Sequence, residues 1–375
     1  MAVAQWARPR VKPEHRGYRT VAGNIRIGSV IYGVGAEIED PKGWLWTLVE
    51  AADGTRSSRD IVTAVLTRHD GLEPGDVTAA LEQLASAGFL EDAAAPLPGQ
   101  FSAREAERYS RGVPLLRWMD LGARASAWEA QLRLKEARVL VLGVGGTGGA
   151  AAWHLAASGV GRLHLLDDDR VELSNLNRQL LYGEADLGRP KAEAAVDRLA
   201  GLNPDVRVTG EIRRVATAGQ LAAVLASSPP YDLFVLGADG PPQIRRWVNR
   251  ACLAAGLPWV DGGYSGPLVT AGIHRPGTGA CWECLHEQAT QQADLGLPEG
   301  ADEPAASAHL PWNPASAVTA GLSGALVAYG ALALLTGVPP LEPGFRFGFN
   351  LMVPGDEVTL RLPRRPDCPA CGSPG

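Results

Sequence analysis

Apolar and polar positions follow two different patterns along the chain, one before and one after a polar stretch that begins near residue 93. Residues 24–39 alternate between apolar and polar side chains and are interrupted by glycines, which is typical of a strand pair. Apolar residues then recur at helical spacing in three stretches, 41–52, 57–69 and 73–87. We therefore predict a small winged-helix-like α+β domain over residues 11–92.

Short continuous apolar runs separated by helical stretches characterise the rest of the chain. The runs lie at residues 138–143, 162–167, 232–237 and 259–261. Runs of this kind, bounded by turns, are typical of parallel strands covered by helices on both faces. We predict an α/β, doubly wound, Rossmann-like domain with a mainly parallel sheet over residues 106–375, preceded by a linker at 93–105.

Composition and charge then exclude several classes of protein. The 375 residues carry 35 Lys plus Arg against 41 Asp plus Glu, a net charge of −6, so no global basic field is present to hold nucleic acid or an anionic membrane. Residues 1–17 lack the apolar core of a secretory signal, and we expect a cytoplasmic protein. Residues 315–338 carry no charge and are long enough to span a bilayer. Their many small side chains favour a buried helix instead.

A glycine-rich turn follows the first apolar run, at Gly143, Gly145 and Gly146. Glycines let the backbone approach phosphate oxygens, and the helix that follows offers free N–H groups and a positive dipole end. Such a turn is also found where a strand simply meets a helix. The next run ends at Asp167, where a carboxylate can accept hydrogen bonds from ribose hydroxyls, so we favour a nucleotide site.

Further charged residues indicate a triphosphate rather than a dinucleotide. Arg178 and Lys191 supply two cations downstream of Asp167. Asp239 ends another apolar run, at the edge where α/β sheets bind ligands and where a carboxylate can hold Mg²⁺.

Together these segments resemble the ubiquitin-activating-enzyme-like adenylyltransferases, the ThiF, MoeB and HesA group. The resemblance covers residues 101–372 and rests on G-V-G-G-T-G at 143–148, D-D-D-R-V-E-L-S-N-L-N-R-Q at 167–179, G-R-P-K at 188–191 and the strand-end Asp239. It implies ATP-dependent adenylation of a carboxylate with release of pyrophosphate. It assigns ribose to Asp167, phosphates to Asn175, Arg178 and Lys191, and Mg²⁺ to Asp239. The complete predicted nucleotide-binding set is Gly143, Gly145, Gly146, Asp167, Asp169, Asn175, Arg178, Gln179, Lys191 and Asp239.

The resemblance also implies a homodimer with shared sites. Residues 108–111, R-Y-S-R, match a family segment, and Arg111 is similar to the arginine that reaches the partner's ATP. Gly112 replaces the usual Gln after this arginine, and Gly240 replaces the usual Asn after Asp239. The predicted catalytic residues, which stabilise charge rather than move protons, are Arg111, Arg178, Lys191 and Asp239.

Four of the five cysteines form two C-x-x-C pairs, Cys281 with Cys284 and Cys368 with Cys371. Two such pairs have the spacing of a structural zinc site with four thiolates, and redox-active pairs are the alternative. No cysteine lies between residues 284 and 368, where relatives carry a thiol nucleophile. We therefore expect no enzyme thioester, and direct attack on the adenylate by an amine, amide or sulfur donor.

Residues 12–92 resemble, by pattern, the PqqD-like peptide-recognition elements of ribosomal natural-product clusters. The resemblance implies a precursor peptide as partner, with its leader added as a strand near residues 18–40. A dimerisation or lid domain is the alternative. For the whole chain, a peptide presenter for a cyclodehydratase and an activator of a sulfur-carrier protein remain open, as do downstream modifying enzymes as partners. Residues 285–316 are polar and predict a lid, a crossover loop or a disordered segment.

Overall fold

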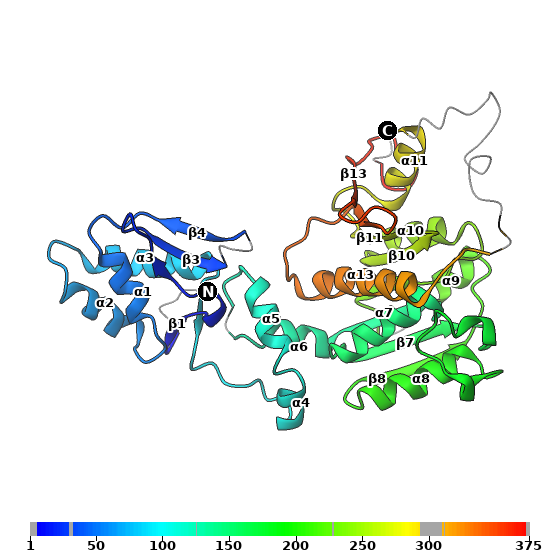
Figure 1. Ribbon diagram of the computed structural model, residues 1–375, viewed down its shortest axis with the longest axis horizontal. Coiled ribbons are helices and arrows are strands. Elements are labelled where there is room, and N and C mark those ends of the chain that lie inside the picture. Colours follow the sequence, from blue (N-terminus) through cyan, green and yellow to red (C-terminus); the bar gives the residue numbers. More distant parts are fainter. Residues whose placement is uncertain are drawn as a thin grey trace. The chain divides into compact units, whose positions relative to one another are not determined.

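The protein is described by a computed structural model covering residues 6–29, 33–124, 126–226, 229–292, 310 and 312–372. The chain divides into two compact units (Figure 1). The N-terminal unit comprises Met1–Arg133 with Val338–Pro340, and the C-terminal unit comprises Leu134–Gly337 with Leu341–Gly375.

The part of the N-terminal unit before residue 93, as far as the structure describes it, combines two small antiparallel sheets with three α-helices. Its strands are β1 (Pro9–Val11), β2 (Tyr18–Arg19), β3 (Ile25–Ser29), β4 (Val34–Ile38) and β5 (Leu90–Asp92), and its first helices are α1 (Trp44–Ala51), α2 (Ser58–Leu66) and α3 (Pro74–Ser86). One sheet has the order β2-β3-β4, and the other pairs β1 with β5. Ile25, Ile27, Leu48 and Ile61 are fully buried between these elements. The predicted strand pair and three helices are therefore present.

Further helices extend the N-terminal unit beyond residue 92. These are α4 (Ala103–Arg108), α5 (Gly112–Met119) and the beginning of α6 (Glu129–Glu136). Arg117 on α5 lies 2.5 Å from Glu14 and 3.2 Å from Glu91, and Lys12 Nζ donates to the Asp120 carbonyl at 2.7 Å. These buried ionic contacts join α5 to the first residues of the chain. The boundary between the compact units thus follows residue 133, later than the predicted linker.

An eight-stranded sheet forms the centre of the C-terminal unit, in the order β13-β12-β11-β10-β9-β6-β7-β8. The strands are β6 (Arg138–Leu142), β7 (Arg162–Asp167), β8 (Arg207–Ile212), β9 (Leu233–Leu236), β10 (Trp259–Ser265), β11 (Leu268–His274), β12 (Phe345–Asn350) and β13 (Glu357–Arg361). The strands from β10 to β8 are parallel, and β11 to β13 continue the sheet antiparallel. The predicted α/β sheet is confirmed, and its antiparallel part is an addition to the prediction.

Helices cover both faces of this sheet. They are α7 (Gly146–Ala157), α8 (Lys191–Leu202), α9 (Ala218–Leu225), α10 (Ile244–Ala255), α11 (Trp282–Gln292) and α13 (Ala317–Thr336). Side chains of α9 and α10 form one core with Leu140 and Phe234 from the strands. On the other face, α13 packs against α7, β10 and β11 (Figure 1). Alternate sides of the strands are therefore buried by different helices, as in a doubly wound domain.

Helix α13 is long and apolar enough by length and composition to cross a membrane. Its small residues have another use in this fold. A Cβ on Gly324 would lie 2.7 Å from the Thr147 carbonyl oxygen of α7, and one on Gly330 would lie 2.9 Å from Ile273 Cγ1 of β11. The glycines thus allow α13 to pack closely on its neighbours, which agrees with the predicted buried helix.

The polar stretch at residues 285–316 is not a loop throughout. Helix α11 continues to Gln292, so the expectation of a loop is wrong for residues 285–292. The first turns of this helix are buried, with Cys284 and Leu285 almost fully inaccessible to solvent. Residues 293–309 and 311 lie outside the described residues.

Candidate functional site

The order of the parallel strands reverses between β6 and β9, because the chain continues outward through β7 and β8 on one side and β10 on the other. Such a reversal opens a crevice at the carboxyl ends of the strands, where α/β proteins bind ligands. A cavity of about 580 Å³ lies at this position. Every residue of the predicted nucleotide-binding set lines it. Sequence segments far apart in the chain are therefore brought to one place, and the binding role of each residue remains a prediction.

The floor of the cavity is the turn between β6 and α7. Gly143 has φ of 84°, and a Cβ at this position would lie 2.6 Å from the Ala238 backbone nitrogen. Glycine is therefore required both for the backbone conformation and for the close approach of the β9 end. Gly145 is the N-cap of α7 and gives it no side-chain cap, so the first N–H groups of the helix are available to an anion at the cavity.

Asp167 is held rigidly at the end of β7. Its side chain accepts hydrogen bonds from the backbone N–H of Val144 at 2.8 Å and of Asp169 at 2.9 Å. Burial raises the pKa of Asp167, and these two hydrogen bonds oppose the shift. The carboxylate is thus fixed beside the glycine turn, where it lines the cavity and has acceptor capacity left for a ligand hydroxyl.

Two cations enter the cavity from different elements. Lys191, the first residue of α8, is only 5% exposed, and its Nζ lies 2.9 Å from Asp169 Oδ2. Arg178 Nη1 donates to the Ser174 carbonyl at 2.7 Å and to Asn177 Oδ1 at 3.1 Å. Arg178 also has a side-chain hydrogen bond with Tyr264. These partners are neutral groups, so the charge of Arg178 is available to an anionic ligand.

Asn175 and Gln179 lie buried on the segment after β7. The Asn175 side chain accepts a hydrogen bond from the Glu172 backbone N–H at 3.1 Å and so caps the N-terminal end of the short helix at residues 173–175. Gln179 is 5% exposed, and its Oε1 has no hydrogen-bond partner among the described residues. A buried amide oxygen without a donor is costly. A ligand or water molecule in the cavity would supply one, so this side chain fits a binding role.

Asp239 follows β9, and its carboxylate contacts a network of ion pairs centred on the buried Asp261. Its carboxylate lies 3.3 Å from Arg245 Nη2, and Arg245 Nε lies 3.2 Å from Asp261. Asp261 also contacts Arg346 at 2.5 Å and His274 at 3.3 Å. Although burial opposes ionisation of Asp261, the nearby Arg346, His274 and Arg245 hold its pKa well below the usual range. The network orients Arg245, while the 84% exposed side chain of Asp239 remains open to a divalent cation.

Sequence reasoning missed several residues of this cavity. Arg213, Arg214 and Tyr264 also line it, and Arg245 fixes Asp239. Two features of the sequence could have indicated these residues: Arg213 and Arg214 directly follow β8, and Arg245 lies in the first turn of α10. Arg111 belongs to the N-terminal unit, where it is the N-cap residue of α5, and its contact with ATP stays a prediction.

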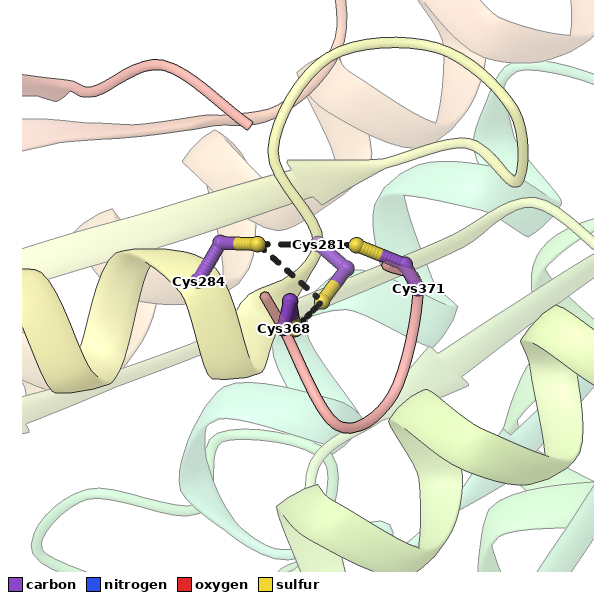
Figure 2. A group of neighbouring side chains, drawn as sticks. All are labelled: Cys281, Cys284, Cys368 and Cys371. Carbon is purple, nitrogen blue, oxygen red and sulfur yellow. Dashed lines mark hydrogen bonds between the residues drawn. The ribbon is translucent and has the colours of Figure 1, made fainter. Parts of the chain in front are cut away.

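The four predicted metal ligands converge from two segments: Cys281 directly precedes α11 and Cys284 lies in its first turn, while Cys368 and Cys371 lie in the C-terminal tail (Figure 2). Their sulfurs lie 3.8 Å apart for Cys281 and Cys284, 3.7 Å for Cys281 and Cys368, and 3.5 Å for Cys284 and Cys371. A tetrahedral zinc ion with Zn–S bonds of about 2.3 Å places sulfurs about 3.8 Å apart. The geometry and the donor set therefore fit a closed four-thiolate metal site. Cys252 lies apart, in the core of α10.

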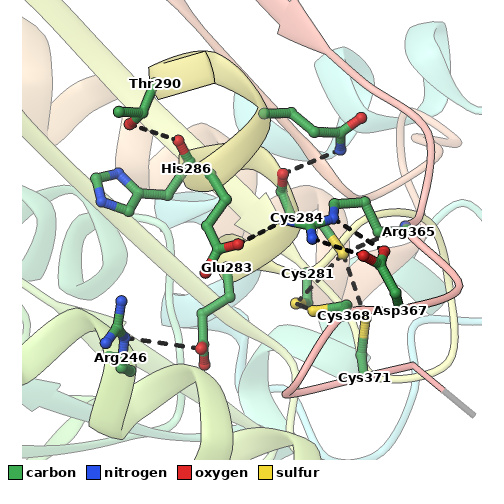
Figure 3. Close-up of polar contacts among 12 residues, drawn as sticks. Arg246, Cys281, Glu283, Cys284, His286, Thr290, Arg365, Asp367, Cys368 and Cys371 are labelled. Atoms are coloured by element: carbon green, nitrogen blue, oxygen red, sulfur yellow. Dashed lines mark hydrogen bonds and ion pairs between the residues drawn. The ribbon is translucent and has the colours of Figure 1, made fainter.

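Polar groups surround the sulfurs and hold their elements in place (Figure 3). Asn249 Nδ2 lies 3.6 Å from Cys281 Sγ, and the Arg365 backbone N–H donates to Cys284 Sγ at 3.5 Å. Arg365 also pairs with Glu287 of α11 at 2.5 Å. Burial raises the pKa of the Cys284 thiol to about 11. A metal would reverse this shift, because it binds the thiolate.

The ThiF family model matches residues 115–370. The chain belongs to the ThiF family. It is 32% identical over 275 residues to the molybdopterin-synthase adenylyltransferase of Escherichia coli K12, which covers 73% of this chain and 99% of that protein. It is 37% identical over 250 residues to the sulfur carrier protein adenylyltransferase of Thermus thermophilus, covering 65% of this chain and 85% of that protein. The chain is thus an ATP-dependent adenylyltransferase of this family.

Solved structures extend the similarity to the N-terminal unit. The structure of the microcin C7 biosynthetic enzyme MccB in complex with N-formylated MccA has a TM-score of 0.70 and 25% identity, and covers 97% of this chain and 99% of that one. The fold and family expected from the sequence are confirmed. The resemblance of the N-terminal unit to PqqD-like elements is not confirmed and stays a prediction.

Proposed function

We propose that this adenylyltransferase activates a carboxyl group of a ribosomally made precursor peptide in natural-product biosynthesis. The observation that carries the proposal is the cavity at the strand reversal, in which Arg178, Lys191 and the α7 N-terminus face the same space. Similarity to an enzyme solved with the peptide MccA, over 97% of this chain, supports a peptide as the molecule that carries the carboxyl group.

The reaction needs charge neutralisation more than proton transfer. The peptide carboxylate, already ionised near neutral pH, attacks the α-phosphorus of ATP; a P–O bond to the β-phosphate breaks and pyrophosphate leaves. Arg178 and Lys191 bind the phosphates, and Asp167 orients the ribose. Asp239 would hold Mg²⁺, which neutralises phosphate charge when bound. Positioning and cations therefore suffice without a general base.

The second half of the reaction takes place without an enzyme thioester. No cysteine lies between residues 284 and 368, and Cys281, Cys284, Cys368 and Cys371 are engaged with one another. An external amine, amide or sulfur donor attacks the carbonyl carbon of the adenylate, and AMP leaves.

The four cysteines hold a structural zinc ion in this proposal. Four thiolates fill a tetrahedral shell and leave no position for water, so the ion has no direct role in catalysis. It would join the tail at residues 368–371 to the start of α11. The close approach of the four sulfurs supports this assignment.

The N-terminal unit binds the leader of the precursor in this proposal. The strands β2 and β4 are the edges of the β2-β3-β4 sheet, and an extended peptide can add to such an edge through backbone hydrogen bonds. The active enzyme is a homodimer in which Arg111 reaches the partner's ATP.

The proposal is tested by peptide-dependent exchange of labelled pyrophosphate into ATP. We expect exchange with the correct precursor, its loss in Lys191→Ala, and no change in Lys42→Ala, which removes an exposed lysine of the N-terminal unit. Exchange that persists in Lys191→Ala contradicts the phosphate site. An absence of exchange with every candidate peptide favours a peptide presenter for a separate cyclodehydratase.

Activation of a sulfur-carrier protein is the second candidate function. It is favoured by the similarity to the sulfur carrier protein adenylyltransferase of Thermus thermophilus. Mass spectrometry separates the two functions, because an adenylated small carrier protein and an adenylated precursor peptide differ in mass. Formation of the carrier adenylate without leader binding supports the second function.

A further inference from the structure

The amino ends of three neighbouring strands carry a row of arginines that the nucleotide cavity does not use. Arg138 of β6 pairs in register with Arg162 of β7, which pairs in register with Arg207 of β8. Residues in register on adjacent parallel strands project to the same face, and such strands lie about 4.8 Å apart. Three guanidinium groups therefore start from neighbouring positions on one face. We call these three residues the arginine row.

The arginine row has no counter-charge of its own within the described residues. Glu211, on the same face of β8, pairs with Arg213 at 3.4 Å and lies 3.9 Å from His164 instead. Asp232 accepts a hydrogen bond from the backbone N–H of Arg138, not from its guanidinium. Like charges placed opposite each other destabilise a sheet. The fold therefore carries a repulsion that an anion would relieve.

One member of the row also has an unsatisfied buried donor. The guanidinium of Arg138 lies over the ring of Tyr231, 4.6 Å from its centroid, and its Nη1 is buried without a hydrogen-bond partner in the described parts of the chain. Beside it is a cavity of about 350 Å³, lined by the arginine row, His164, Thr209 and Pro229. Small-molecule sites begin at about 300 Å³, so the space is large enough for a ligand.

We propose that the arginine row is a second anion site, which binds a phosphate group with at least two negative charges. Guanidinium groups match phosphate oxygens through paired N–H donors, and three of them suit a multivalent oxyanion better than a single carboxylate. The site lies at the amino ends of the strands, whereas the nucleotide cavity lies at their carboxyl ends. The five residues of β6 separate the two by roughly 17 Å, so both can be occupied at once.

The test uses the full chain with Lys191→Ala, which weakens the nucleotide cavity, and titrates it with inorganic pyrophosphate in a calorimeter. We expect saturable binding of one equivalent. Adding Arg162→Gln and Arg207→Gln, two exposed positions, should weaken this binding at least tenfold. The matched control adds Arg198→Gln and Arg361→Gln, whose side chains are 49% and 50% exposed elsewhere in the same unit, and should keep the affinity within twofold.

Inorganic phosphate and AMP form the other arms of the titration. Tighter binding of AMP than of phosphate identifies a nucleoside phosphate as the ligand, and pyrophosphate binding alone identifies an inorganic one. The proposal is overturned when the protein shows no saturable binding of pyrophosphate, phosphate or AMP. It is also overturned when the variant of the arginine row binds pyrophosphate as tightly as the matched control. In chains that keep Lys191, changing Arg162 and Arg207 should leave ATP–pyrophosphate exchange unchanged, so the two proposals fail separately.

Discussion

The substitution Asp261→Asn removes the central charge of the network beneath Asp239. Asp261 is fully buried and contacts Arg245 at 3.2 Å and Arg346 at 2.5 Å, so the change removes the buried carboxylate from both cations and leaves Arg245 with the exposed Asp239 alone among its described carboxylate contacts. Removing one partner of a buried ion pair costs about 3–5 kcal/mol. Because the two arginine side chains are 28% and 22% exposed, we take the lower end, about 3 kcal/mol. For a unit of this size, that corresponds to roughly 6–12 °C in Tm.

Urea unfolding of the full chain at neutral pH measures this loss. The matched control is Asp239→Asn, which makes the same change next to Arg245 on a side chain that is 84% exposed. An exposed pair contributes little, so we expect about 0.5 kcal/mol or less there. Similar losses of unfolding free energy in the two variants, or a loss below about 1 kcal/mol for Asp261→Asn, refute the reasoning.

The same carboxylate predicts a pH dependence with a definite sign. The pKa of folded Asp261 lies below its usual value, so its contribution is complete above the unfolded pKa of about 3.9. That contribution is lost as pH falls from there through the folded pKa. Below pH 4 the unfolding free energy of the wild type should therefore fall more steeply than that of Asp261→Asn. Parallel curves contradict the assignment.

Three further predictions follow from other parts of the molecule. Gly143→Ala should lower the unfolding free energy by more than about 1 kcal/mol and abolish ATP binding, since φ is 84° and the new Cβ would lie 2.6 Å from the Ala238 nitrogen; unaltered ATP titrations argue against the turn's role. Removal of metal by a strong chelator should lower Tm and expose residues 368–371 to proteolysis, and an unchanged melting curve counts against zinc. Arg117→Met should cost about 3 kcal/mol in unfolding free energy, because Glu14 and Glu91 both lose their ion pairs with Arg117, although Glu91 keeps Arg10 at 2.5 Å; a change below about 1 kcal/mol disproves that coupling.

Local patterns predicted the parallel half of the sheet and the motif residues. Each apolar run became a strand, and the residues that follow them meet at the carboxyl ends because parallel strands end at one edge. The antiparallel half was harder to predict. Strand β12 has mixed exposure, whereas β13 alternates between exposed and partly buried residues. Such alternation indicates a strand but not its partner, and β12 pairs with β11, from which α13 separates it in the sequence.

Contacts between distant charged residues also escaped prediction. Asp261 lies within an apolar strand, and only the fold brings Arg346 to it, 85 positions away. Likewise Arg117 forms an ion pair with Glu14, 103 positions away in the sequence. This contact ties α5 to the N-terminal unit, which therefore extends to Arg133, beyond the linker predicted at residues 93–105. Such pairs are chosen by tertiary packing, and charge along the sequence does not specify them.

The central claim is that a triphosphate lies on the glycine turn between Arg178 and Lys191. A crystal structure with a non-hydrolysable ATP analogue tests it most directly. We predict the phosphate chain at the N-terminus of α7, with Asp167 on the ribose and Lys191 drawn from Asp169 to the phosphates. A nucleotide bound elsewhere, or a cavity that stays empty at saturating analogue, would contradict the account.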